Sequence, residues 1–208
     1  MSTGLLGTIG PLPRGPHHLS REHVERSQRR RLAAAMADAC AEDGYATTTV
    51  SAVLRRAEVS RLTFYDLYDG KLACFLDALA LVSEALAAEL EGAIDEDGRP
   101  GPVRAVAALD HYLDTIARNP ALARLYIVEV HAAGPQALGR RAALHDRVAT
   151  TLADLVGADD EQRRFECRAL VAAISALVTV PVATGDIAAL RGLRDPLVAL
   201  LLRLDQAG

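Results

Sequence analysis

Residues Thr47 to Lys71 read TTTVSAVLRRAEVSRLTFYDLYDGK, and this stretch decides the fold. It predicts a short helix capped by Thr49, a turn at 57–59, and a second short helix capped by Ser60. Apolar residues recur at helical spacing in both helices, and a further helix follows directly. Two short helices joined by a tight turn form a helix-turn-helix, which places the start of its second helix in the DNA major groove. The stretch therefore predicts a DNA-binding protein.

The first turns of the second helix carry the chemistry that base reading requires. Arg61 can pair bidentately with guanine, and Thr63 can bond a base or offer a methyl group to thymine. Tyr65 can reach a phosphate through its hydroxyl. Phe64 and Tyr68, four residues apart, lie on another face and are expected to hold the helix on the motif's core. An ordinary helical hairpin with a polar surface is the alternative interpretation.

Short segments around the motif add to this evidence: Asp43-Gly44-Tyr45, Thr48-Thr49-Val50, Val59-Ser60, Thr63-Phe64-Tyr65 and Asp69-Gly70-Lys71, with Phe75 one helical turn beyond. Together they resemble the DNA-binding domain of the TetR family of transcriptional regulators, over residues 29 to 75. The resemblance implies an all-α homodimer of two-domain chains that binds a palindromic operator and is released by a small ligand. Repression is the expected mode.

We expect two kinds of DNA contact from the head. Arg61 and Thr63 should read bases, while Thr49, Tyr65 and Lys71 should hold phosphates. Lys71 is the only lysine of the sequence, and it stands where the resembled family has a lysine that contacts the DNA backbone. The full predicted DNA-contacting set is Thr49, Ser60, Arg61, Leu62, Thr63, Tyr65 and Lys71.

Four residues depart from the family pattern. Glu58 stands where the turn usually carries Gly, and a positive φ strains any residue with a side chain. Asp66 stands where the family often has a basic or aromatic residue, and Leu67 replaces a frequent His or Asn that touches phosphate. Leu62 occupies a site that is often small. These departures bear on the operator sequence and on the strength of phosphate binding. They also support the alternative function, an all-helical small-molecule-binding protein or enzyme that retains a non-functional head.

Composition favours an all-α chain. Half of the 208 residues are apolar, aromatics make up 4%, and Trp is absent, so the core must be built mainly from Ala, Leu and Val. No series of alternating apolar and polar residues predicts a sheet. We expect a Gly/Pro-rich disordered tail at 1–19, a helix-turn-helix domain at 20–70, and a ligand-binding and dimerisation domain at 71–208.

Charge is distributed unevenly along the chain. The net charge is −4, but residues 20–71 carry nine basic against eight acidic side chains, and the remainder of the chain after them is acidic. Arg29-Arg30-Arg31 is the densest positive patch, which fits either nearby phosphates or a solvated helix end. Cys40, Cys74 and Cys167 lie far apart in apolar surroundings and read as core thiols.

The N-terminus lacks the long apolar core of a signal peptide. We expect no stretch apolar and uncharged enough to span a membrane, and a cytoplasmic protein.

The body should contain helices over 71–94, 102–119, 120–131, 135–156, 159–184 and from Asp195 onwards. Pro181 should kink or end its helix. The two last long helices carry broad apolar faces, including Val171, Ile174, Val178, Val198 and Leu201. Two copies could pair through these helices in a four-helix interface, or both faces could be buried within one chain.

A small-molecule effector should bind between the body helices, where pockets of helical bundles form. The candidate contacts are His111, Tyr112, Tyr126, His131 and Phe165, with Glu129 and Arg168 as further polar groups and Ala108 as a pocket wall. The sequence has no Gly-rich phosphate loop, no HExxH, no GxSxG and no metal-ligand spacing. We therefore expect no catalytic site, no cofactor and no metal.

Overall fold

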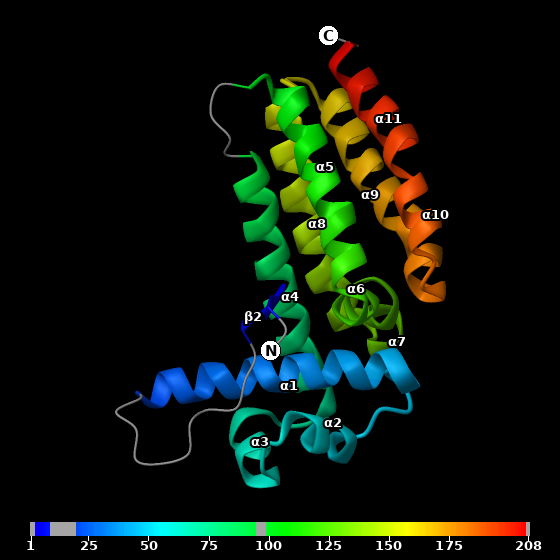
Figure 1. The fold of residues 1–208 in the computed structure, drawn as a ribbon. Helices are drawn as coiled ribbons and strands as arrows, with labels where there is room; N and C mark the ends of the chain where they lie inside the picture. The colour runs from blue at the N-terminus through cyan, green and yellow to red at the C-terminus, as the bar shows by residue number, and fades with distance from the viewer. Residues whose placement is uncertain (1–2, 9–19, 95–98, 207–208) are drawn as a thin grey trace.

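The computed structural model describes residues 3–8, 20–94 and 99–206. Figure 1 shows a small head at one end of an elongated helical body. The head contains α1 (Arg21–Asp43), α2 (Val50–Ala57) and α3 (Arg61–Leu67), and α1 crosses the lower part of α4 (Lys71–Ile94). Because α4 begins in the head and runs up into the body, it joins the two parts mechanically.

The body is a bundle of long helices closed at its lower end by short ones (Figure 1). The long helices after α4 are α5 (Gly101–Arg118), α8 (Pro135–Leu155), α9 (Glu161–Thr184) and α11 (Arg194–Gln206). Between α5 and α8 the chain forms α6 (Pro120–Arg124), the π-helix η1 (Leu125–Glu129) and α7 (Val130–Ala133), and α10 (Ile187–Gly192) precedes α11. The all-α fold is confirmed, with a π-helical turn inside the segment expected as one helix over 120–131.

Local capping explains the helix-turn-helix. The Thr49 hydroxyl accepts from the Ala52 N–H at 3.2 Å, and the Ser60 hydroxyl accepts from the Thr63 N–H at 3.0 Å. Gly44 ends α1 with φ 77°, and Glu58 ends α2 in the left-handed region with φ 51°. Among the described residues, Glu58 is the one non-glycine with positive φ. Both caps and the unusual turn are therefore as the sequence predicts.

The head has a continuous aromatic and aliphatic core. Leu32 and Met36 of α1, Val53 of α2, Phe64 of α3 and Phe75 of α4 are all fully buried in it. Each of the four helices thus contributes a large side chain to the same core. Burying each such side chain stabilises the fold by about 1.5–3 kcal/mol, so α3 is held firmly in place.

Several details differ from the sequence predictions. Residues 3–8 form a small antiparallel hairpin, β1 (Thr3–Gly4) with β2 (Gly7–Thr8), in which Leu6 is buried and the Leu5 N–H donates to the Asn119 side chain at 3.0 Å. The rest of the predicted disordered tail lies outside the described residues. Helix α9 continues past Pro181 to Thr184. Helix α11 begins at Arg194, one residue before the expected start at Asp195.

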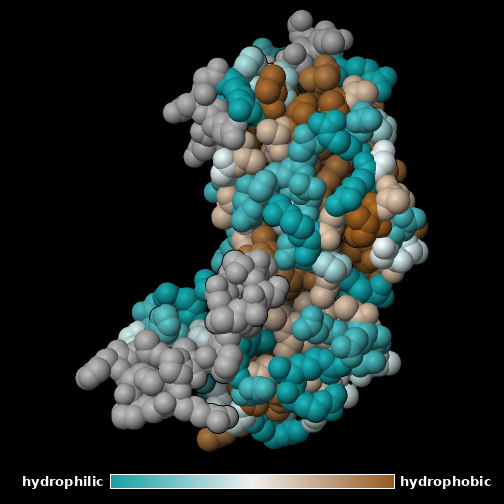
Figure 2. Space-filling model, in the orientation of Figure 1, coloured by the Kyte–Doolittle hydropathy of each residue, from teal (hydrophilic) through white to brown (hydrophobic). Residues whose placement is uncertain are grey.

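We expected no stretch apolar enough to span a membrane, and by length and composition alone helix α9 contradicts this expectation. Over Glu161–Thr184 it is long and apolar enough to cross a membrane, with a mean hydropathy of 1.8 in its best window. The core helix of a protein that does not enter a membrane can have the same length and composition. Hydrophobic side chains are visible along the C-terminal helices, whereas the head surface is mainly hydrophilic (Figure 2).

Candidate DNA-contacting surface and ligand cavity

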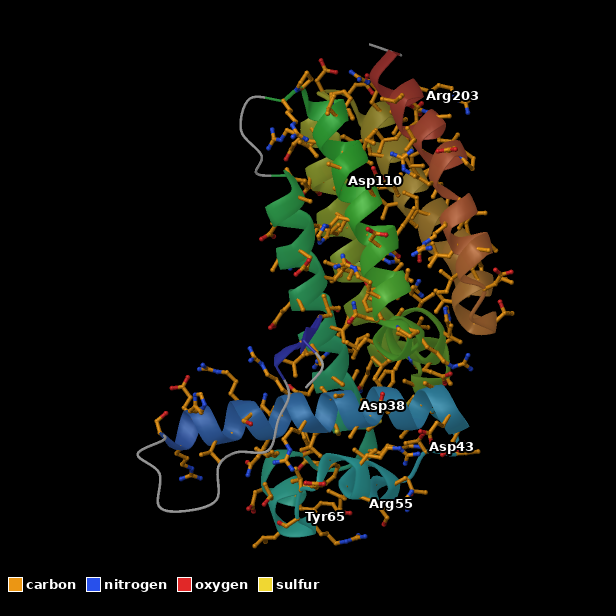
Figure 3. All side chains as sticks on the ribbon, viewed as in Figure 1. Asp38, Asp43, Arg55, Tyr65, Asp110 and Arg203 are labelled. Atoms are coloured by element: carbon orange, nitrogen blue, oxygen red, sulfur yellow. The ribbon has the colours of Figure 1, made fainter. Side chains whose placement is uncertain are left out.

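Helix α3 presents its N-terminal half to solvent. Arg61 is exposed, Leu62 is 75% exposed and Tyr65 is 51% exposed, while Phe64 and Tyr68 are buried beneath them. The Phe64 ring contacts the rings of both tyrosines, with centroids 5.3 and 5.4 Å apart. Tyr65 lies at the outer base of the head, facing away from the body (Figure 3). The predicted base-reading helix is therefore exposed on one face and anchored on the other.

The predicted polar contacts on this surface are linked to one another. The Arg61 guanidinium donates to the Ser51 hydroxyl at 2.8 Å, which ties the start of α3 to the start of α2. The hydroxyls of Ser60 and Thr63 lie 2.8 Å apart. Thr49 is exposed at the start of α2. All the predicted DNA-contacting residues that precede α4 are exposed or half-buried on the head surface.

Lys71 has a structural role that the sequence does not reveal. Its Nζ donates to the backbone carbonyls of Tyr45 at 2.9 Å and Ala46 at 3.3 Å, and it lies 4.3 Å from the centroid of the Tyr45 ring. It thereby fastens the first turn of α4 to the loop between α1 and α2. Lys71 stays a predicted phosphate contact, and any such contact would start from an ammonium group already bonded within the head.

The Arg29-Arg30-Arg31 patch is divided between two uses. Arg29 pairs with Asp77 of α4 at 3.0 Å. Arg31 donates to the Ala57 carbonyl and, at 2.7 Å, to the Glu58 carbonyl, so it satisfies the C-terminal end of α2 at the strained turn. Arg30 is exposed. Two of the three arginines therefore support the internal structure of the head.

The body contains a cavity of about 140 Å³ between its helices. Side chains of α4, α5, η1, α8, α9 and α11 line it, and most are aliphatic. Of the predicted ligand contacts, Tyr112 and Tyr126 line the cavity, and Ala108 forms part of its wall. The space lies where the sequence places an effector site.

Three of the predicted ligand contacts lie outside this cavity. His111 pairs with Glu89 at 2.5 Å on the outside of the bundle. His131 is exposed, although its Nε2 lies 3.2 Å from the Arg141 guanidinium. Phe165 is 55% exposed on α9, with its ring 5.7 Å from the guanidinium of Arg168. None of the three lines the cavity, and a helical pattern alone does not determine which side chains do.

Sequence reasoning missed the most unusual group in the body, Arg141. It is 6% exposed, its Nη2 donates to the Ser175 hydroxyl, and its guanidinium lies 5.6 Å from the Tyr126 ring centroid. Among the described residues no carboxylate forms an ion pair with it. The Arg141 Nε and the Tyr126 hydroxyl are both buried without a hydrogen-bond partner in the described part of the chain.

His145, which also lines the cavity, is affected by this charge. Burial lowers the pKa of His145 to about 4, and the positive charge of Arg141 contributes in the same direction. Burial also raises the pKa of Tyr126 to about 12. His145 is therefore neutral and Tyr126 protonated near neutral pH, which leaves Arg141 as the charge at this end of the cavity.

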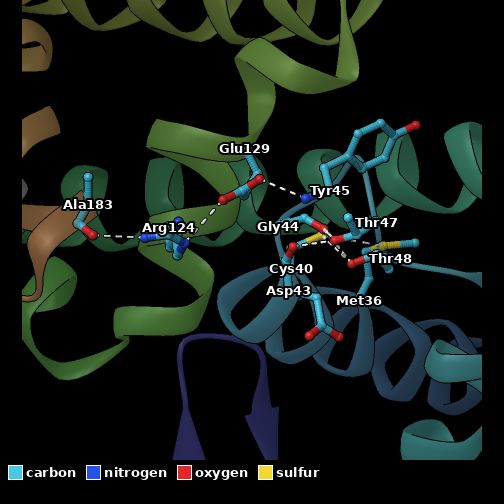
Figure 4. Close-up of polar contacts among 10 residues, drawn as sticks. All are labelled: Met36, Cys40, Asp43, Gly44, Tyr45, Thr47, Thr48, Arg124, Glu129 and Ala183. Carbon is cyan, nitrogen blue, oxygen red and sulfur yellow. Dashed lines mark hydrogen bonds and ion pairs between the residues drawn. The ribbon is translucent and has the colours of Figure 1, made fainter.

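Glu129 connects the body to the head (Figure 4). It is buried; one carboxylate oxygen accepts from the Tyr45 N–H at 2.8 Å, and the other accepts from Arg124 Nε at 3.1 Å. Arg124 in turn donates to the Ala183 carbonyl near the end of α9 at 2.9 Å. Glu129 was expected near the ligand, but it lies at the junction between η1 and the loop that leads into α2.

Comparison with known proteins defines the fold. No protein-family model matches the sequence, and no curated protein matches it. The fatty acid degradation regulator FadR of Bacillus halodurans superposes with a TM-score of 0.73 at 16% identity, covering 84% of this chain and 94% of its own. A TetR-like transcriptional regulator of Rhodococcus sp. RHA1 gives 0.68 at 21% identity, covering 89% and 97%. A second tetR-family regulator from Rhodococcus RHA1 gives 0.64 at 21% identity, covering 85% and 96%.

This chain therefore has the TetR-like fold, as the resemblance of residues 29 to 75 implies, and it has it over nearly the whole length of these regulators. Within the described residues, no group of three or more His, Cys, Asp or Glu side chains is placed to hold a metal ion.

Proposed function

We propose that this chain is a transcriptional regulator that binds a palindromic operator as a homodimer and leaves it when a small molecule fills the body cavity. The observation that carries the proposal is the outer face of α3, where Arg61 and Tyr65 are exposed above the buried Phe64. A short helix held in this way fits the major groove. Repression is the mode we propose, because a protein released by its ligand blocks transcription until that ligand arrives.

The DNA-binding proposal can be tested without knowing the operator. Sites are selected from random duplexes, and affinity is then measured by fluorescence anisotropy at several salt concentrations. Arg61→Ala should weaken binding to the selected site by about 1–3 kcal/mol and relax preference at one position of each half-site. Arg203→Ala removes the same charge at the far end of the body (Figure 3) and serves as the control. An equal loss on selected and random DNA would contradict base reading by Arg61.

A second copy of this chain is the partner we propose for the C-terminal helices. Large apolar side chains remain exposed on α9 and α11, namely Phe165, Leu177, Val180, Leu200 and Leu202. Val171, Val178 and Leu201, which we expected to carry the surplus, are buried within one chain. The exposed apolar side chains lie close in sequence to these buried ones on the same two helices. Pairing two copies of α9 and α11 in a four-helix arrangement would cover them.

Light scattering after size exclusion tests this interface. The chain should run as a dimer at micromolar concentration, and Val180→Asp should give a folded monomer with strongly reduced operator affinity. Val103→Asp places the same charge on an exposed apolar site of α5 and is the matched control. A monomeric wild-type protein that binds its operator tightly would contradict the proposed interface.

The proposed coupling between cavity and head runs through two elements. Leu86 and Leu90 of α4 line the cavity, and α4 continues into the head. Tyr126 of η1 also lines it, and Glu129 in the same turn bonds the Tyr45 N–H of the head. A ligand that favours another arrangement of η1 or α4 would shift the population of head positions. Ligand and operator must then weaken each other by the same factor, typically about 5–150-fold.

The Glu129 contact allows a specific test of the coupling. Glu129→Gln keeps the shape but removes the charge that holds Arg124, so ligand and DNA should each still bind while their mutual effect falls. Glu84→Gln, an exposed position on α4, is the control. If the mutual effect is unchanged in Glu129→Gln, the coupling does not pass through this carboxylate.

The second candidate function is a helical small-molecule carrier or enzyme whose head no longer reads DNA. The observations that favour it are the exposed acidic residues Glu58 and Asp66 and the internal bonds of Lys71. Selection from random duplexes distinguishes the two, because a carrier would enrich no sequence. For the regulator we propose a cytoplasmic location, where operator DNA is accessible.

A further inference from the structure

Arg141 is a buried cation without an anion. A guanidinium removed from water is costly unless it is paired and fully hydrogen-bonded. Here its acceptors are the Ser175 hydroxyl, the His131 ring nitrogen at 3.2 Å and the Ile127 carbonyl at 3.4 Å, and its Nε has none. These partners are neutral or weak, so the chain itself leaves most of the positive charge uncompensated.

The groups around Arg141 open onto the cavity. Ser175, Tyr126 and His145 all line it, and each faces the guanidinium through a bond, a ring contact or its electrostatic effect. The Tyr126 hydroxyl is a second buried donor without an acceptor. Arg141 itself does not line the cavity but bonds Ser175, which does, so its positive charge lies next to the lining beside the Tyr126 hydroxyl. A ligand bound at this polar end must supply acceptors.

Elsewhere the charges of the cavity cancel. Glu91 and Arg147 are exposed at its rim, where they pair across α4 and α8 at 3.3 Å. Burial keeps His145 neutral near pH 7 by lowering its pKa to about 4. Among the described residues that line the cavity, Glu91 and Arg147 thus compensate each other, whereas Arg141, which is bonded to the lining residue Ser175, is left without an anion.

The remainder of the cavity is apolar. Leucine, isoleucine and valine side chains of α4, α5, α8 and α9 line the space between the Arg141 end and the rim. Its volume of about 140 Å³ is close to that of cavities that bind a small apolar molecule. A ligand that fits both parts must combine a small acceptor group with an apolar portion that can extend towards the rim.

We propose that the cavity binds a small amphipathic carboxylate, with its carboxylate at the Tyr126–Ser175 end in partnership with Arg141 and its apolar part among the leucines towards the rim. This inference rests on the proposed ligand response, since it names the chemical class of that ligand. A carboxylate supplies two oxygens that only accept, which matches the guanidinium fork and the phenol. A neutral ligand of the same size would fill the cavity but leave Arg141 unpaired.

Calorimetric titration of the full chain with octanoate and with octan-1-ol tests the proposal. The two probes share the alkyl chain and differ in the head group. Wild-type protein should bind octanoate at least tenfold more tightly than octanol. Arg141→Met, which keeps the length and removes the charge, should abolish that preference while leaving octanol binding within about twofold.

Two further variants keep the test sharp. Tyr126→Phe removes a single hydroxyl and should weaken octanoate several-fold without affecting octanol. Arg140→Met alters the neighbouring arginine, which donates to the Leu76 carbonyl outside the cavity, and should leave the preference intact. If Arg141→Met fails to fold, Tyr126→Phe and Arg141→Lys report on the same site, with Arg141→Lys keeping charge but losing the two-pronged geometry.

The outcomes separate this inference from the proposed function. Equal affinity for acid and alcohol, no binding of either, or a preference that survives Arg141→Met would overturn the carboxylate assignment. Operator binding that depends on Arg61 would leave the regulator proposal standing in each of those cases. Conversely, a strong octanoate preference in a chain that enriches no DNA sequence would support the carboxylate site and contradict the regulator.

Discussion

The head and the body are both helical and share α4, but the head has a fully packed core and the body surrounds a cavity. The head buries large side chains such as Phe64, Phe75 and Met36 completely, and it closes its loops with Lys71 and Arg31. The body surrounds a space of about 140 Å³ and keeps a buried cation without an anion beside it. A solid unit presents one fixed surface, whereas a hollow unit gains stability when something fills it.

Under the proposed function, this difference would let one chain combine a rigid recognition surface with a response to a ligand. Packing at the density of a protein interior makes the head move as a unit. A partly polar cavity allows a ligand to favour one arrangement of the body over another. In the proposed coupling, the hydrogen bond from the Tyr45 N–H to Glu129 is the contact through which a change in the body would reach the head.

Truncating the head core gives the largest expected effect. Phe64→Ala removes a fully buried ring that contacts Tyr65 and Tyr68, and it should lower the free energy of unfolding by about 3–5 kcal/mol. Leu62→Ala, on the exposed side of the same helix, should change it by less than about 0.5 kcal/mol. Urea denaturation followed by circular dichroism measures both. Similar losses in the two variants would mean that the head is not packed around Phe64.

Acid should weaken the body through His145. Its pKa is about 4 in the folded chain against 6.5 for an ordinary histidine, so the unfolded chain takes up this proton first as the pH falls. The stability contributed by neutral His145 is complete above pH 6.5 and is lost between pH 6.5 and 4. Allowing for partial solvent screening, wild type should lose about 1–2 kcal/mol more than His145→Gln between pH 7 and pH 5. Parallel pH profiles for the two proteins would show that His145 is not held neutral.

Replacing the buried cation should stabilise the body while removing its proposed function. Arg141→Met takes an uncompensated charge out of the interior and should raise the free energy of unfolding by about 1–2 kcal/mol without ligand. Ser175 can then bond a carbonyl of its own helix. Arg140→Met is again the control. A clear destabilisation in urea titrations would identify Arg141 as a structural residue. The contrast between a head whose polar groups are bonded and a body with an unpaired buried cation would then no longer hold.

The same contrast governs what the sequence could predict. In the head the signals are local: Thr49 and Ser60 cap helices that start next to them, and the left-handed turn at Glu58 follows from its position between those helices. The partners of Lys71 lie 25 and 26 residues away, and nothing in the local pattern indicates them.

In the body, prediction depended on which side of a long helix faces inwards. Tyr112 lines the cavity and its neighbour His111 does not, because adjacent residues point about 100° apart on a helix. Arginine is almost always exposed, so a single arginine on an ordinary helix gives no sign that Arg141 is buried. Burial of this kind is decided by packing among helices distant in sequence.

The smallest expected effect concerns the one strained residue of the head. Glu58 has φ 51°, which costs a residue with a side chain about 1–2 kcal/mol, and it places a negative charge close to the proposed DNA surface. Glu58→Gly removes both the strain and the charge, at the cost of a more flexible unfolded chain, so stability should rise by about 0.5–1 kcal/mol. Glu58→Ala removes the charge but keeps a Cβ in the same backbone region, so it should tighten DNA binding as much as Glu58→Gly without the stabilisation. Both substitutions retain the carbonyl that accepts from Arg31. Urea denaturation measures the change in stability, and anisotropy on random duplexes measures the change in DNA affinity. If Glu58→Ala stabilises the head as much as Glu58→Gly, the turn is not strained. If neither variant tightens binding, this turn lies away from the DNA.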